Sequence, residues 1–143
     1  MVKQLDDTET IEHVGIVLWR AATAWRTRFR EEMARRGYPW HLGAAGEVLA
    51  HLGPSGISQA VLAQRMGVSK QAVQQLVDRL EAQGVVARVD EPTDRRARRV
   101  VLTSLGLEDF AERNRVKRAI ETDYRERLGA DYAPLLRGLE KLG

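Results

Sequence analysis

Residues 57–106 read ISQAVLAQRMGVSKQAVQQLVDRLEAQGVVARVDEPTDRRARRVVLTSLG, and this stretch decides the fold. It opens with two short helical segments joined by a turn at residues 66–69. Gly67 can take the positive φ that a tight turn requires. Ser58 and Ser69 are good N-cap residues for the first and the second helix. Two short helices joined by a glycine-containing turn predict a helix-turn-helix.

Two β-branched runs follow the second helix, which is expected to end near Gln83 and Gly84. The runs are residues 85–89 and 99–103, and they flank the polar residues 90–98. This pattern predicts a β-hairpin with a long charged tip, which would form a wing beside the helix-turn-helix.

Apolar residues at steps of three and four predict helices on both sides of this core. Residues 8–36 form one long helix and residues 42–52 a second. After the wing, residues 105–128 form a charged helix and residues 132–142 a short last one. The first helix would be about 43 Å long, more than a domain of this size can cover, so we expect it to project toward a second chain. The predicted fold class is mainly α with a small β-hairpin wing.

Composition limits the classes of function. The 143 residues are 43% hydrophobic, which suits one domain with its own core. The net charge of +3 arises entirely in residues 57–103, which carry 8 basic and 5 acidic residues. Because cysteine is absent, disulfides, thiolate zinc sites and a catalytic thiol are excluded. No apolar run approaches the length of a membrane span, so we expect a soluble, cytoplasmic protein.

The outward face of the motif's second helix is rich in glutamine. The apolar residues Val73, Val77 and Leu80 share the opposite face. A glutamine amide can pair with the N6/N7 edge of adenine, and the second helix of such a motif enters the major groove. Taken alone, this glutamine-rich face is explained as well by a solvent-exposed surface without any ligand as by DNA binding. We predict DNA contacts from Ser69, Lys70, Gln71, Gln74 and Gln75.

The predicted wing tip concentrates positive charge at residues 94–99, where four arginines accompany one aspartate. Arginine inserts well into a narrow minor groove, and Asp94 could orient a neighbouring arginine by ion pairing. Charge runs are usually only solvated loops, but this one stands next to a helix-turn-helix. We predict that Arg95, Arg96 and Arg98, together with Asp94, belong to the DNA-binding surface.

The whole stretch resembles the winged helix-turn-helix core of MarR-type transcriptional regulators. The order of elements agrees over nearly the whole chain. The residues that carry the resemblance are Leu62-Ala63, Val77-Asp78-Arg79-Leu80-Glu81, Gly84, Arg88, Asp94-Arg95-Arg96, Leu102-Thr103 and Gly106.

The resemblance implies a single domain over residues 1–143 and an obligate homodimer. Residues 8–36 and 104–143 would be its dimerisation helices, and residues 41–103 its winged helix-turn-helix. It also implies a repressor that binds a pseudo-palindromic site on double-stranded DNA. Ser69, Gln71 and Gln75 match recognition-helix contact positions, and Arg96 matches the wing arginine with Asp94 as its partner. Which glutamines read bases stays open.

MarR-type proteins commonly bind small aromatic or phenolic anions between the dimer helices and the DNA-binding lobe. Flat or cationic side chains near that crevice are therefore candidate effector contacts. We expect Trp25, which fits the apolar stripe of the first helix, to serve in packing. The oxidant-sensing branch of the family requires a reactive thiol and is excluded here. The candidates are His13, Trp19, Arg20, Trp40 and His41.

Two alternatives stand beside this interpretation. His41, Glu47 and His51 could bind zinc in a metal-responsive regulator, since Glu47 and His51 would share a helix face. The second alternative is a winged-helix module that binds a protein instead of DNA. Such a module would have no reason to keep the wing arginines and the glutamines. No catalytic motif is present, and we expect neither an enzyme nor a bound cofactor or metal.

Overall fold

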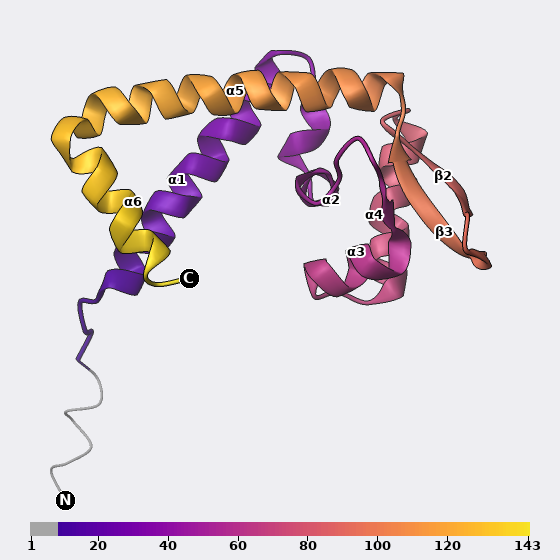
Figure 1. The fold of residues 1–143 in the computed structure, drawn as a ribbon, viewed down its shortest axis with the longest axis horizontal. Coiled ribbons are helices and arrows are strands. Elements are labelled where there is room, and N and C mark those ends of the chain that lie inside the picture. The colour runs from indigo at the N-terminus through magenta and orange to yellow at the C-terminus, as the bar shows by residue number, and fades with distance from the viewer. Residues whose placement is uncertain (1–8) are drawn as a thin grey trace, which may run out of the picture.

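A computed structural model describes residues 9–143, apart from the side chain of Arg95. The predicted fold class is confirmed: the chain is mainly helical with one small antiparallel sheet. In Figure 1, α5 runs from the wing at one end to α6 at the other. Across residues 9–143 no helix combines the length and apolar character needed to cross a membrane. The elements are α1 (Val14–Arg35), η2 (Pro39–Leu42), α2 (Gly46–Ala50), β1 (Ile57–Ser58), α3 (Gln59–Met66), α4 (Lys70–Ala82), β2 (Val86–Glu91), β3 (Asp94–Leu102), α5 (Ser104–Leu128), η3 (Gly129–Asp131) and α6 (Tyr132–Glu140).

The helix-turn-helix consists of α3 and α4, and its turn has the predicted chemistry. Gly67 ends α3 in the left-handed region with φ 66°. Ser69 caps α4, and its hydroxyl oxygen accepts a hydrogen bond from the backbone N–H of Ala72 at 3.0 Å. Ser58 occupies the predicted N-cap position of α3, although its side chain makes no cap hydrogen bond. Ser58 is also the second residue of the short strand β1, which the sequence did not indicate, and it pairs there with Arg99 of β3.

The wing differs from the predicted long charged tip. The strands β2 and β3 extend as far as Glu91 and Asp94, which leaves only Pro92 and Thr93 in the turn. The sheet order is β1-β3-β2, with all pairs antiparallel. A two-stranded ribbon exposes both faces to water, so charged residues can occupy it without interrupting the strands. Cross-strand pairs of opposite charge near the tip stabilise it further.

The helices before the motif are shorter than predicted. Helix α1 begins at Val14, and Ile11, which belonged to the predicted stripe, is 73% exposed. His13 at the N-cap position makes no side-chain cap bond, and nothing in the described chain covers the apolar residues that precede it. Thr8, the predicted start, lies outside the described residues. Of the predicted helix 42–52, only α2 is α-helical, and Leu42 is instead the last residue of η2 and is 57% exposed.

Two separate apolar cores hold the molecule together. The core of the winged-helix lobe contains the buried apolar side chains of α2, α3, α4 and the sheet. A second, smaller core contains Met33 of α1 together with Val116 and Ile120 of α5, flanked by Trp25 and Phe29. The lobe and the scaffold formed by α1, α5 and α6 are therefore distinct packing units joined along α5. The predicted packing role of Trp25 is confirmed.

Candidate nucleic-acid interface

Helix α4 presents the predicted polar face. Val73, Val77 and Leu80 are fully buried against the lobe core. Between residues 9 and 143, no hydrogen bond occupies a side-chain amide of the α4 glutamines, so these groups can donate to and accept from a ligand. The exposed side chains of this face are Lys70, Gln71, Gln74 and Gln75.

The wing arginines lie in strand β3 and not in a loop. Alternate residues of a strand face the same side, so Arg96 and Arg98 project on the side of the buried Val100. Arg98 forms an ion pair with Asp90 at 3.0 Å. Arg96 has no ion-pair partner among the described side chains, and of the described wing arginines it is the one most available to an anion. The side chain of Arg95 lies outside the described part of the structure.

Asp94 does not form the predicted ion pair with Arg96. Its Oδ1 atom accepts a hydrogen bond from the backbone N–H of Arg96 at 2.9 Å. Aspartate commonly closes turns in this way, by bonding the backbone two residues later. Asp94 therefore shapes the wing tip and leaves the Arg96 guanidinium without a neutralising carboxylate.

A hollow of about 300 Å³ separates the wing from the helix-turn-helix. Lys70, at the first turn of α4, faces Arg96 and Arg98 across it. Three predicted contact residues from two elements therefore surround one space. A phosphate group there would meet the charges of Lys70 and Arg96 and that of Arg98, which Asp90 partly neutralises. Gln59 of α3, which sequence reasoning did not select, also lines it.

Arg88 of β2 connects the wing to α3 and α4. Its Nε donates to Gln59 Oε1 at 3.0 Å, and one of its terminal nitrogens donates to the carbonyl of Gln74 at 3.0 Å. The guanidinium also pairs with Asp78 at 2.8 Å and Glu81 at 3.2 Å. Arg88 thereby neutralises the two carboxylates of α4 and fixes that helix against the wing. The sequence feature that could have identified this role is the alternation of side chains along a strand. It puts Arg88 on the same face of β2 as the buried Val86.

The structure does not bring the predicted effector residues together. His13 and Arg20 line a hollow at the start of α1, and Trp19 is 73% exposed. Trp40 donates its indole N–H to Asp109 at 2.9 Å. His41 is buried, with its Nε2 atom 2.7 Å from the same carboxylate.

A cavity of about 280 Å³ lies between α1, α2 and α5, and of the predicted effector residues only His41 lines it. The rings of Trp25 and Phe29 are stacked with centroids 5.4 Å apart and provide a flat apolar wall. Arg26 and Arg30 share Glu47 as their carboxylate partner. The rest of the wall is Gly46, Ala50, Arg113 and Lys117.

Lys117 is the cation of this cavity that has no ion-pair partner among the described residues. Burial lowers the pKa of the Lys117 ammonium group, and the positive charge of Arg113 lowers it further. An anion placed in the cavity would stabilise the charged form of Lys117 and would face an excess of positive charge.

The alternative zinc site is not assembled. In the described part of the chain, no group of three or more histidine, aspartate and glutamate side chains is arranged to hold a metal ion. Glu47 is paired with arginines, and His41 is directed at Asp109.

Comparison with known families relates this geometry to other proteins. The sequence model of the MarR family matches residues 42–97, which include the whole helix-turn-helix and most of the wing. This part of the chain is similar to the MarR family. A search of curated proteins found no match.

Solved structures show that the similarity in fold extends over about nine-tenths of the chain. The transcriptional regulator PA3341 is 28% identical, with a TM-score of 0.65 over 91% of this chain and 98% of that one. The Multiple Antibiotic Resistance Repressor, MarR, is 22% identical, with a TM-score of 0.71 over 92% and 95% of the two chains. A mutant MarR from E. coli complexed with operator DNA is 22% identical, with a TM-score of 0.70 over 90% and 91%. The chain thus has the fold of MarR-family transcriptional regulators.

Proposed function

We propose that this protein is a sequence-specific DNA-binding regulator of transcription. One observation carries the proposal: the unengaged glutamines of α4 and the wing cations Arg96 and Arg98 belong to one lobe, whose two parts meet at a shared cationic hollow. In this arrangement α4 enters the major groove and β2–β3 reaches the flanking minor groove. A MarR-family neighbour with the same fold has been solved in complex with operator DNA, which supports the same mode of binding here.

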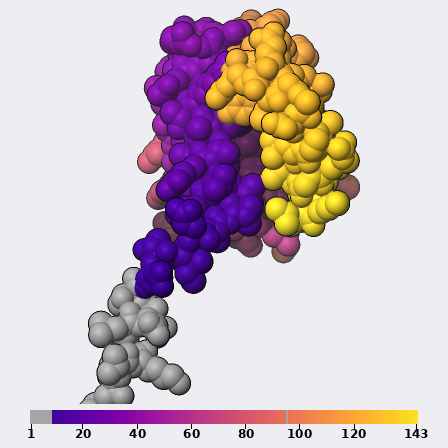
Figure 2. Space-filling view, turned by 90° about the vertical axis from the view of Figure 1, so that its left-hand side faces the viewer, coloured from indigo at the N-terminus to yellow at the C-terminus, as the bar shows by residue number. Residues whose placement is uncertain are grey.

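The functional unit we propose is a homodimer. Large apolar side chains are exposed on the scaffold, among them Val14 and Val17 of α1, which are 63% and 61% exposed. On α6, Leu135 and Leu136 are 45% and 40% exposed. Figure 2 shows α1 and the C-terminal segment on one face of the molecule, so a second copy could cover both helices at once. Two copies related by a twofold axis would read half-sites about 10 base pairs apart.

The finer proposal is a repressor that a small aromatic anion releases from DNA. The cavity between α1, α2 and α5 supports it, because Trp25 and Phe29 offer a flat surface and Lys117 an uncompensated charge. A fold neighbour is named a repressor. A ligand can release the DNA only if it binds two arrangements of the dimer with different affinity.

Selection from a pool of random duplexes tests the proposal. The purified chain should enrich a pseudo-palindromic sequence, and fluorescence anisotropy should then give an affinity for it that decreases with salt. A purified chain that remains folded but enriches no sequence, at low salt as well as at physiological salt, would favour the protein-interaction module instead.

A further inference from the structure

The contact between the two apolar cores is polar. On α5, Leu105 and Phe110 pack against the lobe core, whereas Val116 and Ile120 belong to the scaffold core. Two charged residues of the same stretch are almost inaccessible to solvent: Asp109, directly before Phe110, and Arg113, between Phe110 and Val116. The side chain of Asp109 is 0% exposed and that of Arg113 is 4% exposed, and their Oδ2 and Nε atoms are 2.9 Å apart.

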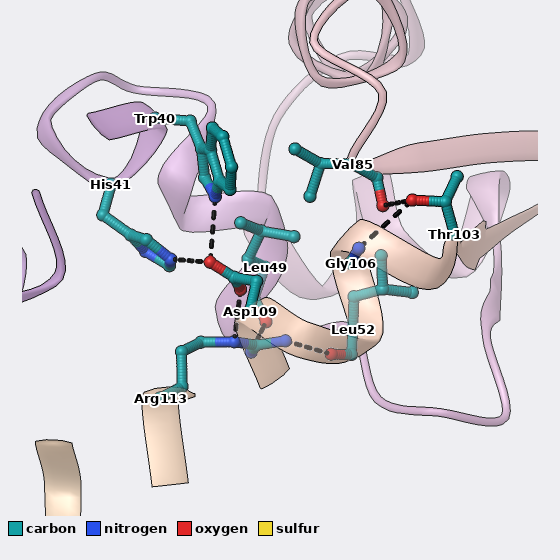
Figure 3. Close-up of polar contacts among 9 residues, drawn as sticks. All are labelled: Trp40, His41, Leu49, Leu52, Val85, Thr103, Gly106, Asp109 and Arg113. Atoms are coloured by element: carbon teal, nitrogen blue, oxygen red, sulfur yellow. Dashed lines mark hydrogen bonds and ion pairs between the residues drawn. The ribbon is translucent and has the colours of Figure 1, made fainter. Parts of the chain in front are cut away.

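Asp109 connects α5 to the segment that leads out of α1. Its Oδ1 atom lies 2.9 Å from the indole nitrogen of Trp40 and 2.7 Å from Nε2 of His41. Figure 3 shows both rings directed at this one carboxylate. The carboxylate therefore fixes η2 against α5 through two directional contacts.

Arg113 connects α5 to the short helix α2. Its guanidinium donates to the backbone carbonyls of Leu49 and Leu52, the latter at 3.3 Å (Figure 3). The last carbonyls of a helix have no partner within it, and α2 spans only 5 residues. Leu49 and Leu52 are themselves part of the lobe core, 0% and 2% exposed. Arg113 therefore holds the backbone of the lobe core.

A buried ion pair is a weak source of stability, because desolvation of the two charges offsets their attraction. What distinguishes these polar contacts is that they are directional. The hydrogen bonds of Asp109 and Arg113 permit one arrangement of the lobe on α5, whereas apolar surfaces can slide against each other. We infer that Asp109 and Arg113 are positioning residues that fix the orientation of the winged-helix lobe on α5. In the dimer of the proposed function, on which this role in DNA binding rests, they set the separation of the two α4 helices.

The contacts of Asp109 and Arg113 with η2 and with the carbonyls of Leu49 and Leu52 form a polar joint between lobe and scaffold. The cavity between α1, α2 and α5 lies against this joint. His41 and Arg113 take part in these contacts and also line the cavity, where the His41 ring meets Phe29 edge-on with centroids 5.5 Å apart. An anion bound there would contact the residues that hold the lobe, so the joint is placed to transmit occupancy of the cavity to α4.

Spin labels test the inference within a single chain, whether or not the chain is a dimer. Because the protein has no cysteine, labels can be introduced as Gln64→Cys on α3 and Glu126→Cys on α5, both at exposed positions. Labelled chain diluted with an excess of unlabelled chain then reports the distance from lobe to scaffold. The native background should give one narrow distance distribution, and Arg113→Lys should broaden or shift it, since lysine cannot bond both carbonyls and Asp109.

Matched controls separate positioning from general destabilisation. Arg115→Lys changes an exposed arginine of the same helix and should leave the distribution narrow. Asp109→Asn, with Glu108→Gln as its control, provides a second test should Arg113→Lys lose its cooperative melting. On a selected duplex, the joint variants should bind about tenfold more weakly while their non-specific DNA binding stays about the same. The inference would be overturned if either variant, Arg113→Lys or Asp109→Asn, remained folded and gave a distance distribution with the same width and the same mean as the native chain.

Discussion

The amide and guanidinium groups of the DNA-binding lobe differ in what they can recognise. Glutamine can read the edge of adenine, whereas arginine on the wing interacts with phosphates and with the potential of the minor groove. Gln75 is the residue we choose to test base recognition, and Arg96 the residue we choose to test contact with the DNA backbone and minor groove. Both are exposed, and neither side chain is paired with another described residue.

Gln75→Ala and Arg96→Ala should therefore weaken binding in different ways. Gln75→Ala is expected to cost about 1–3 kcal/mol on the selected duplex and little on random DNA. Arg96→Ala should weaken binding to both and should lower the slope of log affinity against log salt by about 1. Titrations of both duplexes at several salt concentrations measure this. Equal losses on both duplexes for Gln75→Ala would remove its base-reading role.

Arg88 contributes through α4 without needing to touch DNA. Replacing it with methionine keeps much of the aliphatic stem but leaves Asp78 and Glu81 unneutralised beside the polyanion. Arg88→Met should lower the free energy of unfolding by about 1–3 kcal/mol and should also weaken DNA binding. The control is Arg79→Met, at an exposed position on α4. Urea denaturation that gives the same midpoint for Arg88→Met and the native chain would contradict the bridging role.

At the scale of elements, the junction between β3 and α5 depends on a glycine. A Cβ atom on Gly106 would lie 2.2 Å from the carbonyl oxygen of Val85. Thr103 caps α5 at the same place, where its hydroxyl oxygen accepts a hydrogen bond from the Gly106 N–H at 3.1 Å and donates to that carbonyl (Figure 3). The close approach brings the first turn of α5 against the end of α4.

Gly106→Ala should therefore destabilise the protein by about 1–3 kcal/mol or more, because backbone must move to admit the methyl group. Gly138→Ala in α6 is the matched control, since a Cβ there meets nothing within 4 Å. That substitution should stabilise the chain by about 0.5–1 kcal/mol through helix propensity. Thermal melts compare the two. A Gly106→Ala protein as stable as the native one would show that the junction is looser than described.

The sequence predicted those elements whose signals are local. Gly67 and Ser69 specify the turn of the motif by their own backbone and capping preferences, and α3 and α4 follow from them. The wing was predicted less well, because the four arginines within residues 95–99 look alike in sequence. Only the fold distinguishes Arg99, which donates to the Ser55 carbonyl at 2.6 Å, from Arg96. The strand β1 has 2 residues and no signal of its own.

At the scale of the whole molecule, the sequence did not reveal the polar joint. Asp109 and Arg113 fall in a charged helix whose spacing suits a solvated i,i+4 pair. Their burial depends on Trp40, His41 and the carbonyls of Leu49 and Leu52, all distant in sequence. The dispersal of the predicted effector residues has the same reason, since side chains of α1 and η2 that are near in sequence lie in different places: His13 and Arg20 line a hollow at the start of α1, whereas Trp40 and His41 contact Asp109.

The scaffold should lose stability in acid. A hydrogen bond from Arg36 holds the pKa of Glu112 below its ordinary range, and one from Arg28 does the same for Asp123. Both contacts join α1 to α5. A carboxyl whose pKa is lower in the folded state stabilises the fold above its unfolded pKa, about 4.3 for Glu and about 3.9 for Asp. This stability is lost as the pH falls through the folded-state values.

The free energy of unfolding should therefore decrease as the pH is lowered from about 5 through the unfolded-state values and below. The double variant Glu112→Gln, Asp123→Asn should show a smaller decrease than the native chain. Denaturant titrations across this range measure it, with Glu108→Gln as an exposed control. A decrease of the same size in the native chain and the double variant would assign the acid sensitivity to other groups.

The comparison of a selected duplex with a scrambled duplex of equal length tests the central claim most directly. Equilibrium titration at physiological salt should give two chains per selected duplex and an affinity at least about 10³-fold above that for the scrambled one. Equal affinity for the two duplexes would contradict sequence-specific recognition by α4 and the wing.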